Sequence, residues 1–183
     1  MKKKTDLTEI VEERERLYAG GYMTVEKQFL RLPDGRDAVR EIVHVRNAVA
    51  VLPLLPDGDV VLVRQYRPAI RRTLLEIPAG LLDENEDEEA AAIRECEEET
   101  GYRPRQLHKL IRYAHAEGYS TGWITLYAAT NLEKTGRIFL DRTELLEQVQ
   151  MSFAELQRLV RENQIVDSKT ILGAVLAKAW MGL

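Results

Sequence analysis

The sequence predicts a mixed α/β fold, an α+β arrangement in which helices pack on a mixed central sheet. Three observations lead to it: strand candidates come first, one acidic helix interrupts them, and helices close the chain. The first 46 residues are extended and turn-rich, so we expect them to form a small antiparallel β unit. We therefore expect two domains, residues 1–46 and residues 47–183.

The composition is that of a globular protein with enough apolar residues to bury a core. Of 183 residues, 45% are apolar and 31% are charged, and the formal net charge is −4. This balance gives no reason to expect a nucleic-acid or membrane partner. No apolar run approaches the length of a membrane helix or a secretory signal, and there is a single cysteine, Cys96. We expect a cytoplasmic protein.

Turn-forming residues divide the chain into strand candidates. Pro33-Asp34-Gly35 and Pro56-Asp57-Gly58-Asp59 suit tight turns, because proline presets one backbone dihedral angle and glycine accepts the next. Residues 48–55 form a continuous apolar run, typical of a strand buried on both faces. Residues 6–18 are charged and suit either a helix or a long edge strand. The other strand candidates are residues 22–32, 38–46, 60–66, 73–77, 107–115, 122–130 and 144–151.

Three helices are predicted from their end signals. Residues 86–100 should form a helix that ends at Gly101, a residue suited to a left-handed cap position. Ser152, with Glu155 three residues later, matches a capping box and predicts a second helix start. Ser168 is expected to cap the final helix.

The first of these helices carries the chemistry. Glu95, Glu98 and Glu99 are spaced i, i+3 and i+4 and share one face, while Ile93 and Cys96 fall on a roughly opposite face. We expect the helix to bury the apolar face and present three carboxylates on the other. Their mutual repulsion would be removed by a divalent cation, and such hard oxygen ligands suit Mg²⁺ or Mn²⁺. The alternative interpretation is a solvated acidic face.

The flanking residues favour the metal. The pattern resembles the Nudix box, G-x5-E-x7-R-E-U-x-E-E-x-G-U, where U is a bulky apolar residue. Its fixed positions are all present, at Gly80, Glu86, Arg94, Glu95, Glu98, Glu99 and Gly101. Only Cys96 and Tyr102 stand where an aliphatic residue is usual, and Cys96 is best interpreted as a small core residue.

The resemblance to the Nudix hydrolase superfamily implies an α/β/α sandwich with a loop–helix–loop metal site. It implies that Mg²⁺, or Mn²⁺ in its place, is bound by Ala79 through its backbone carbonyl and by Glu95, Glu98 and Glu99. Structural roles are implied for Gly80, Glu86, Arg94 and Gly101, with Arg94 orienting the glutamates and Glu86 bracing the loop. The implied chemistry is attack of water on phosphorus in a diphosphate, with Glu98 among the catalytic residues.

Segments outside the box resemble the branch of ADP-ribose pyrophosphatases and nucleotide-sugar hydrolases. These segments are Arg40-Glu41-Ile42, Arg64-Gln65-Tyr66-Arg67, residues 75–80 and residues 165–170. In that branch an N-terminal antiparallel unit exchanges across a homodimer, and the nucleoside diphosphate substrate lies between the subunits. The implied substrate-binding residues are Tyr22, Arg40, Arg67, Leu81 and Glu117.

Three departures weaken ADP-ribose as the specific substrate. The usual Ser-Pro-Gly is Ala116-Glu117-Gly118, and Thr121-Gly122 stands where an acidic residue is usual. Arg142 occupies the usual position of the general base, so Glu144 becomes the first candidate for that role. Behind it come Asp141, Glu147 and Glu117, and His115 is a further acid–base candidate whose alternative is a structural histidine.

Three functions follow from these residues. The leading one is Mg²⁺-dependent hydrolysis of a nucleoside diphosphate linked to a sugar, either ADP-ribose or a nucleotide sugar. The second is a Nudix ligand-binding or sensor module with weak catalysis, suggested by the altered loop residues. The third is an enzyme of another Nudix branch that acts on triphosphates.

Overall fold

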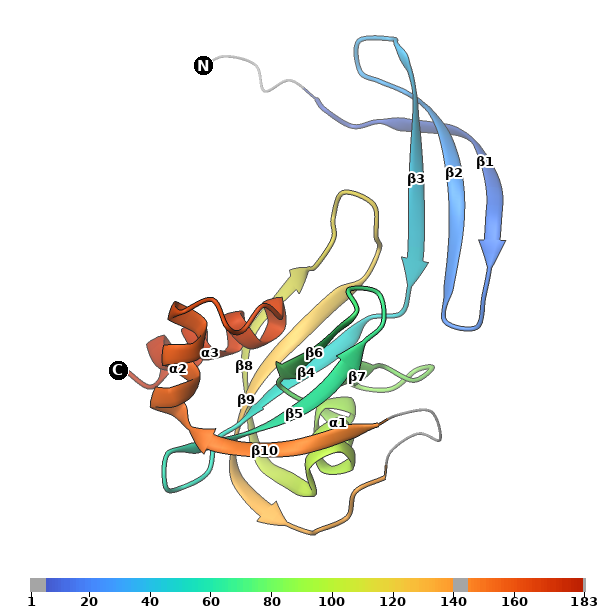
Figure 1. The fold of residues 1–183 in the computed structure, drawn as a ribbon. Helices are drawn as coiled ribbons and strands as arrows, with labels where there is room; N and C mark the ends of the chain where they lie inside the picture. Colours follow the sequence, from blue (N-terminus) through green and yellow to red (C-terminus); the bar gives the residue numbers. More distant parts are fainter. Residues whose placement is uncertain (1–5, 140–144, 183) are drawn as a thin grey trace. The chain divides into compact units, whose positions relative to one another are not determined.

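A computed structural model of the protein describes residues 6–139 and 145–182 (Figure 1). The chain divides into two compact units. One comprises Met1–Asn47 and Ala114–Trp123, and the other comprises Ala48–Tyr113 and Ile124–Leu183. The expected division into domains at residue 46 stays a prediction.

The first unit contains a three-stranded antiparallel sheet in the order β1-β2-β3. Its strands are β1 (Ile10–Ala19), β2 (Met23–Arg31) and β3 (Asp37–Val45), so the charged N-terminal segment is a strand and not a helix. The predicted turn between β2 and β3 is present, with the Gly35 N–H donating to the Leu32 carbonyl at 2.9 Å and Gly35 at a φ of 87°.

A mixed sheet lies at the centre of the second unit, as predicted. Its order is β7-β4-β9-β8. Strand β4 (Ala48–Pro53) pairs in parallel with β9 (Trp123–Lys134) and antiparallel with β7 (Ala79–Leu81), and β8 (Tyr102–Ala114) forms an edge. An antiparallel sheet in the order β10-β5-β6 completes the unit, and its strands are β5 (Asp59–Arg67), β6 (Arg72–Glu76) and β10 (Leu146–Ser152).

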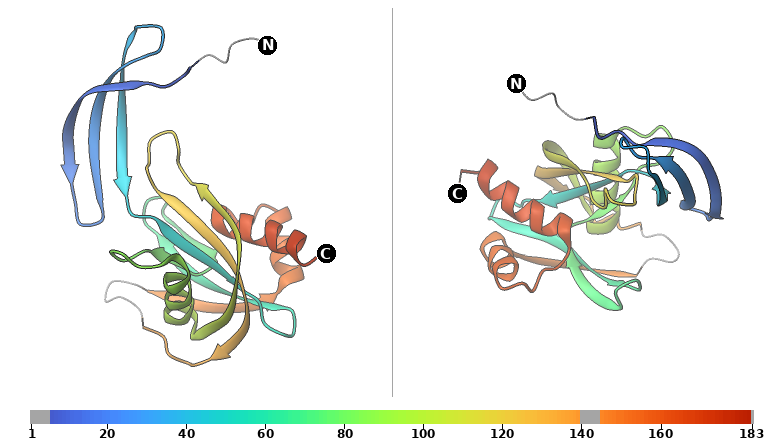
Figure 2. Two further views of the ribbon diagram at one scale, coloured as in Figure 1. Left: turned by 180° about the vertical axis from the view of Figure 1, so that it is seen from behind. Right: turned by 90° about the horizontal axis from the view of Figure 1, so that it is seen from above.

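Strand β4 is buried on both faces because helices cover both sides of the mixed sheet (Figures 1 and 2). Ala50 and Leu52 join a core with residues of α2 (Phe153–Arg161) and α3 (Ser168–Trp180). Val49 and Val51 point to a second core formed with α1 (Glu88–Thr100). Each of these valine and leucine side chains contributes roughly 1.5–3 kcal/mol on full burial. The layers are helix, sheet and helix, which confirms the predicted α/β/α sandwich.

Two helix starts differ from the prediction. Helix α1 begins at Glu88 because Asp87 is its N-cap, and the Asp87 side chain accepts the backbone N–H groups of Glu89 and Ala90. Glu86 therefore lies in the loop before the helix. Helix α3 is capped by Asp167, and Ser168 is the first residue of the helix. Aspartate and serine are both favoured N-cap residues because each side chain accepts an exposed backbone N–H, so the sequence allowed either position.

The other predicted helix ends are confirmed. Ser152 caps α2 and accepts the Glu155 backbone N–H at 3.1 Å. Gly101 ends α1 in the left-handed conformation, with a φ of 70° and its N–H donated to the Glu97 carbonyl. Among the described residues, the helices are all too short or too polar to span a membrane.

Candidate metal and substrate site

The site is built where β7 meets α1. Gly80 lies on β7 with its α-carbon facing the helix, and a Cβ at this position would overlap the Glu95 carboxylate. Only glycine leaves the strand backbone open to this carboxylate. The Glu95 side chain is 13% exposed, so the strand and the helix together shield most of it from solvent.

Arg94 ties the loop to the helix. Its guanidinium donates to Glu86 through Nε and Nη2, both at 2.8 Å, and through Nη1 to Glu95 at 2.6 Å and Glu98 at 3.1 Å. Nη2 also donates to the Leu81 carbonyl at 3.3 Å. Arg94 thus contacts two box glutamates and Glu86 of the preceding loop, and the roles of orienting the glutamates and bracing the loop stay predictions.

The same contacts change the protonation of the site. The hydrogen bond from Arg94 lowers the pKa of Glu86 to about 2, with help from the Asp83 backbone N–H and against a smaller effect of burial. The pKa of Arg94 is raised, chiefly by its hydrogen bond to Glu86. At neutral pH this loop is therefore held by a fully ionised pair.

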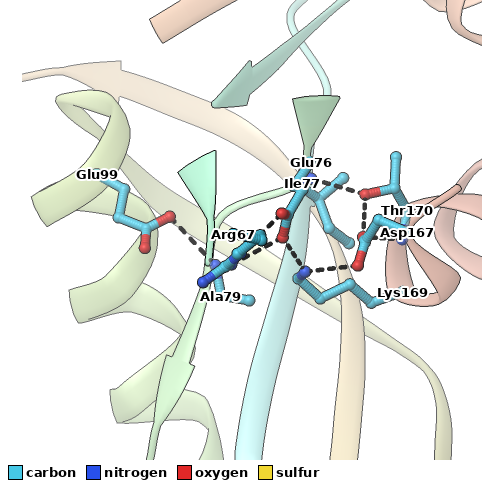
Figure 3. A network of polar contacts seen from close by, with 8 residues as sticks. All are labelled: Arg67, Glu76, Ile77, Ala79, Glu99, Asp167, Lys169 and Thr170. Atoms are coloured by element: carbon cyan, nitrogen blue, oxygen red, sulfur yellow. Dashed lines mark hydrogen bonds and ion pairs between the residues drawn. The ribbon is translucent and has the colours of Figure 1, made fainter. Parts of the chain in front are cut away.

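Glu99 is buried, which corrects one expectation. The sequence predicted that all three glutamates share an exposed face, but Glu99 is 6% exposed and its Oε2 accepts the Ala79 N–H at 3.2 Å (Figure 3). The reason is that β7 packs against this side of α1, a tertiary contact that helix periodicity alone does not reveal. Cys96 is fully buried, as predicted, and Ile93 is only half-buried.

The donor set fits a hard divalent cation. The carboxylates of Glu95 and Glu99 both lie against the Ala79–Gly80 backbone, so two hard oxygen donors come close to the same short segment. Glu98 adds a third carboxylate, 34% exposed, on the same helix. Within residues 6–139 and 145–182, no group of three or more acidic, histidine or cysteine side chains is already arranged as a cation cage. Glu95 and Glu98 instead form ion pairs with the Arg94 guanidinium.

Arg67 is held in place by a buried carboxylate. Its Nε and Nη2 each donate to Glu76 at 2.8 Å, and Glu76 is only 1% exposed (Figure 3). Burial tends to raise the pKa of Glu76, but Arg67 and Lys169 together outweigh it and the pKa is lowered. The Arg67 side chain is 40% exposed, and its predicted role in substrate binding stays a prediction.

Sequence reasoning missed Glu76 and its partner Lys169. A signal was available, because Glu76 interrupts the apolar run Leu74-Leu75-Glu76-Ile77. A charge inside a buried strand requires a partner of opposite charge. The partner could not be identified, since Lys169 lies 93 residues further along the chain.

The other predicted substrate residues are spread over both units. Leu81 is half-buried on β7 in the second unit, whereas Tyr22, Arg40 and Glu117 belong to the first unit. Tyr22 is 62% exposed, and Arg40 pairs with Glu9 at 2.6 Å. Their roles in substrate binding stay predictions.

The acid–base candidates are placed only in part. Glu144, Asp141 and Arg142 lie outside the described residues. Glu147 pairs with Arg64 at 2.9 Å on the β10–β5 pair. His115 Nδ1 lies 3.2 Å from the Gly122 carbonyl, a contact that suits the structural alternative.

The sequence of this chain is similar to those of known proteins. Residues 44–171 match the family described as NUDIX domain. The chain is 32% identical over 158 residues to the ADP-ribose pyrophosphatase of Bacillus subtilis (strain 168), covering 86% of this chain and 85% of that protein. It is 35% identical over 159 residues to a protein of Bacillus methanolicus named methanol dehydrogenase activator, covering 86% of each.

A solved structure agrees with the fold. The crystal structure of an ADP compounds hydrolase superimposes with a TM-score of 0.85 and covers 97% of this chain and 96% of that one. At 24% sequence identity, this likeness concerns the fold alone.

Proposed function

The chain belongs to the Nudix family of hydrolases, and from that membership we propose that it is a Mg²⁺-dependent pyrophosphatase acting on a nucleoside diphosphate linked to a sugar. ADP-ribose would give AMP and ribose 5-phosphate. A nucleotide sugar would give a nucleoside monophosphate and a sugar 1-phosphate. In either case the oxygen of water bonds to one phosphorus and the bridging P–O bond breaks.

One observation carries this proposal. The complete box is folded so that Glu95 and Glu99 meet the Ala79–Gly80 backbone while Arg94 holds the loop through Glu86. The relative named ADP-ribose pyrophosphatase supports the substrate class, because it aligns over most of both chains.

Each side chain has a proposed task in the reaction. A bound Mg²⁺ would neutralise the diphosphate and lower the pKa of the attacking water. Glu95, Glu98, Glu99 and the Ala79 carbonyl would hold it, with Glu98 also facing the reacting water. Arg67 binds Glu76 through Nε and Nη2, so Nη1 takes no part in that pair and is proposed to donate to a phosphate oxygen.

Glu144 is proposed as the general base, and the proton of the attacking water would pass to it. Tyr22, Arg40, Leu81 and Glu117 are proposed to contact the base, the phosphates or the sugar.

A product assay tests the proposal. The protein is incubated with Mg²⁺ and a panel of ADP-ribose, GDP-mannose, UDP-glucose, diadenosine polyphosphates and a nucleoside triphosphate, and the products are separated and identified. We expect a nucleoside monophosphate from a diphosphate compound, with all turnover abolished by EDTA. Cleavage of the triphosphate alone would favour the other Nudix branch. Binding without any product, even at high protein concentration, would favour the sensor module.

A second candidate function rests on the relative named methanol dehydrogenase activator. In this alternative, the chain would activate a dehydrogenase. The test measures the turnover of a methanol dehydrogenase with and without this protein. Unchanged dehydrogenase turnover at equimolar protein would remove this candidate.

We also propose a homodimer in the cytoplasm. The first unit exposes large apolar side chains on its strands, and dimerisation would cover them. These side chains are Ile10, Leu17, Tyr18 and Val39.

The proposed cytoplasmic location agrees with the state of the cysteine. Cys96 is fully buried, and burial raises the pKa of its thiol to about 12. The thiol is therefore unreactive and suits a reducing compartment.

A further inference from the structure

A network of buried charges lies behind the proposed metal site, at the N-terminus of α3. Lys169 is 9% exposed and donates to Glu76, which is 1% exposed, and to Asp167 at 2.8 Å (Figure 3). Arg67 binds the same Glu76 carboxylate through both of its oxygens. The side chain of Glu76 is therefore fixed by two cations.

The backbone next to Glu76 is fixed by the same helix. The Thr170 hydroxyl, fully buried, accepts the Ile77 N–H at 2.9 Å and donates to Asp167 at 2.5 Å. Asp167 in turn caps α3 through the Thr170 N–H at 2.9 Å. The first turn of α3 thus holds both the side chain of Glu76 and the peptide that follows it in one closed ring of hydrogen bonds.

This segment leads directly into the site. Two residues after Ile77 comes Ala79, whose N–H donates to Glu99, and then Gly80, which faces the Glu95 carboxylate. Between them the Pro78 carbonyl accepts the Val51 N–H at 3.0 Å. A displacement of residues 76–79 would therefore move the backbone against which both box glutamates lie.

We propose that Lys169 and Thr170 are positioning residues for the metal site: by fixing residues 76–79 they hold the Ala79–Gly80 backbone in register with Glu95 and Glu99. The inference rests on the metal site of the proposed function, and adds to it two residues that lie outside the box. Their hydrogen bonds described above are made to Glu76, Ile77 and Asp167. Groups that orient metal ligands from behind commonly change metal affinity 10- to 100-fold when they are removed.

A purely structural role makes a different prediction, and Thr170 separates the two. Thr170→Val keeps the shape of the side chain and removes the hydroxyl, whereas Thr170→Ser keeps the hydroxyl and removes a methyl group. Positioning requires the hydroxyl, so Thr170→Val should impair the site and Thr170→Ser should not. Core packing alone predicts that the loss of the methyl group matters at least as much as the loss of the hydroxyl.

The experiment measures Mn²⁺ affinity by electron paramagnetic resonance of the free ion. We compare wild type, Thr170→Val, Thr170→Ser and Lys169→Met, with Lys178→Met as the matched change on an exposed residue of α3. Leu156→Val, in the fully buried core, controls for general destabilisation. Amide hydrogen exchange of Ala79 in the metal-free protein is followed in parallel.

We expect Mn²⁺ affinity to fall about 10-fold in Thr170→Val and Lys169→Met, with faster exchange at the Ala79 amide. Thr170→Ser, Lys178→Met and Leu156→Val should bind Mn²⁺ as wild type does. Wild-type affinity in a folded Thr170→Val protein would overturn the inference. The inference would also be overturned if Leu156→Val lost Mn²⁺ affinity in proportion to its loss of folding stability.

The outcomes also separate this inference from the proposed function. If wild type binds Mn²⁺ but cleaves no nucleoside diphosphate compound, the proposed function fails and the Mn²⁺ comparison still decides the inference. If wild type binds no Mn²⁺ at all, the metal site and this inference are both overturned. Should Lys169→Met not fold, the two conservative Thr170 variants carry the test.

Discussion

Gly80 shows how a single residue can decide the geometry of the site. Most glycines are kept for backbone conformations that other residues rarely adopt, but here the cause is space, because the Glu95 carboxylate occupies the volume of a side chain. Arg94 acts at the same scale, since one guanidinium holds Glu86, Glu95 and Glu98 together. The residues of the box are thus linked by contacts that depend on one another.

Replacing Gly80 by alanine should displace Glu95. The new methyl group would overlap its carboxylate, so the end of the Glu95 side chain must move away from β7. We expect Mn²⁺ affinity and kcat/KM each to fall roughly 10- to 100-fold, measured by ion titration and steady-state kinetics. The melting temperature is recorded alongside. A Gly80→Ala protein that binds Mn²⁺ like wild type would show that the close approach is unimportant.

The low pKa of Glu86 predicts an acid-side loss of stability. Arg94 lowers this pKa from 4.5 to about 2, so the pair stabilises the folded protein fully above pH 4.5. The contribution declines as the pH falls from 4.5 toward 2, because the carboxylate becomes protonated. Urea unfolding across this range should show a shallower decline in Glu86→Gln than in wild type. Glu84→Gln, an exposed neighbour, is the matched control, and an identical decline in wild type and Glu86→Gln would refute the prediction.

At the scale of elements, the helix ends determine where functional side chains lie. Asp87 caps α1 and so leaves Glu86 in the loop, where it can reach Arg94. Asp167 caps the N-terminus of α3 and also accepts a hydrogen bond from Lys169, so the same carboxylate marks the start of the helix and completes the ring behind the site.

Removing the cap of α1 should destabilise the protein. Asp87→Ala leaves the N–H groups of Glu89 and Ala90 without their acceptor, and such a loss costs about 1 kcal/mol. Asp87→Asn keeps an acceptor oxygen and should retain most of the stability. The free energies of unfolding from urea titrations compare the two. Equal stability of the alanine and asparagine variants would contradict the role of the cap.

Local signals in the sequence were sufficient to predict most elements. The apolar run at residues 48–55, the turn at Gly35 and the cap at Gly101 each depend on neighbouring residues, and each is confirmed. Residues 6–18 stayed ambiguous between helix and strand. The reason is that pairing with β2, and not the local pattern, decides the conformation of β1.

The parts of the site that could not be predicted depend on contacts between distant segments. The burial of Glu99 follows from the packing of β7 on α1, and the pair of Glu76 with Lys169 joins residues 93 positions apart. The box itself was predicted because its spacing is local to one loop and one helix. The general base is still a prediction, since Glu144 lies outside the described residues.

At the scale of the whole molecule, the two units have different sources of stability. The second unit buries two cores, one on each side of the mixed sheet. The first unit has a three-stranded sheet whose strands leave several large apolar side chains exposed. A small sheet with a solvated apolar surface gains stability when a partner covers it, which supports the proposed homodimer.

Charges on that apolar surface should dissociate the dimer. The double variant Ile10→Glu and Leu17→Glu replaces residues that are 64% and 48% exposed, so its folded monomer should tolerate the change. Sedimentation velocity should show a dimer for wild type and a monomer for the variant. Arg16→Glu, an exposed charge change on the same strand, should stay dimeric. A wild-type protein that sediments as a monomer at every concentration would contradict the proposal.

The most direct test of metal-dependent diphosphate hydrolysis compares two adjacent glutamates of α1. Glu98 is a proposed ligand, whereas Glu97 is a variable position of the box that pairs with Arg103. Release of the nucleoside monophosphate from the diphosphate compound that wild type cleaves is measured with Mg²⁺ and with EDTA for wild type, Glu98→Gln and Glu97→Gln. We expect EDTA to abolish turnover, Glu98→Gln to lose at least 100-fold in kcat, and Glu97→Gln to stay near wild type. Full turnover in Glu98→Gln, or in EDTA, would contradict the account.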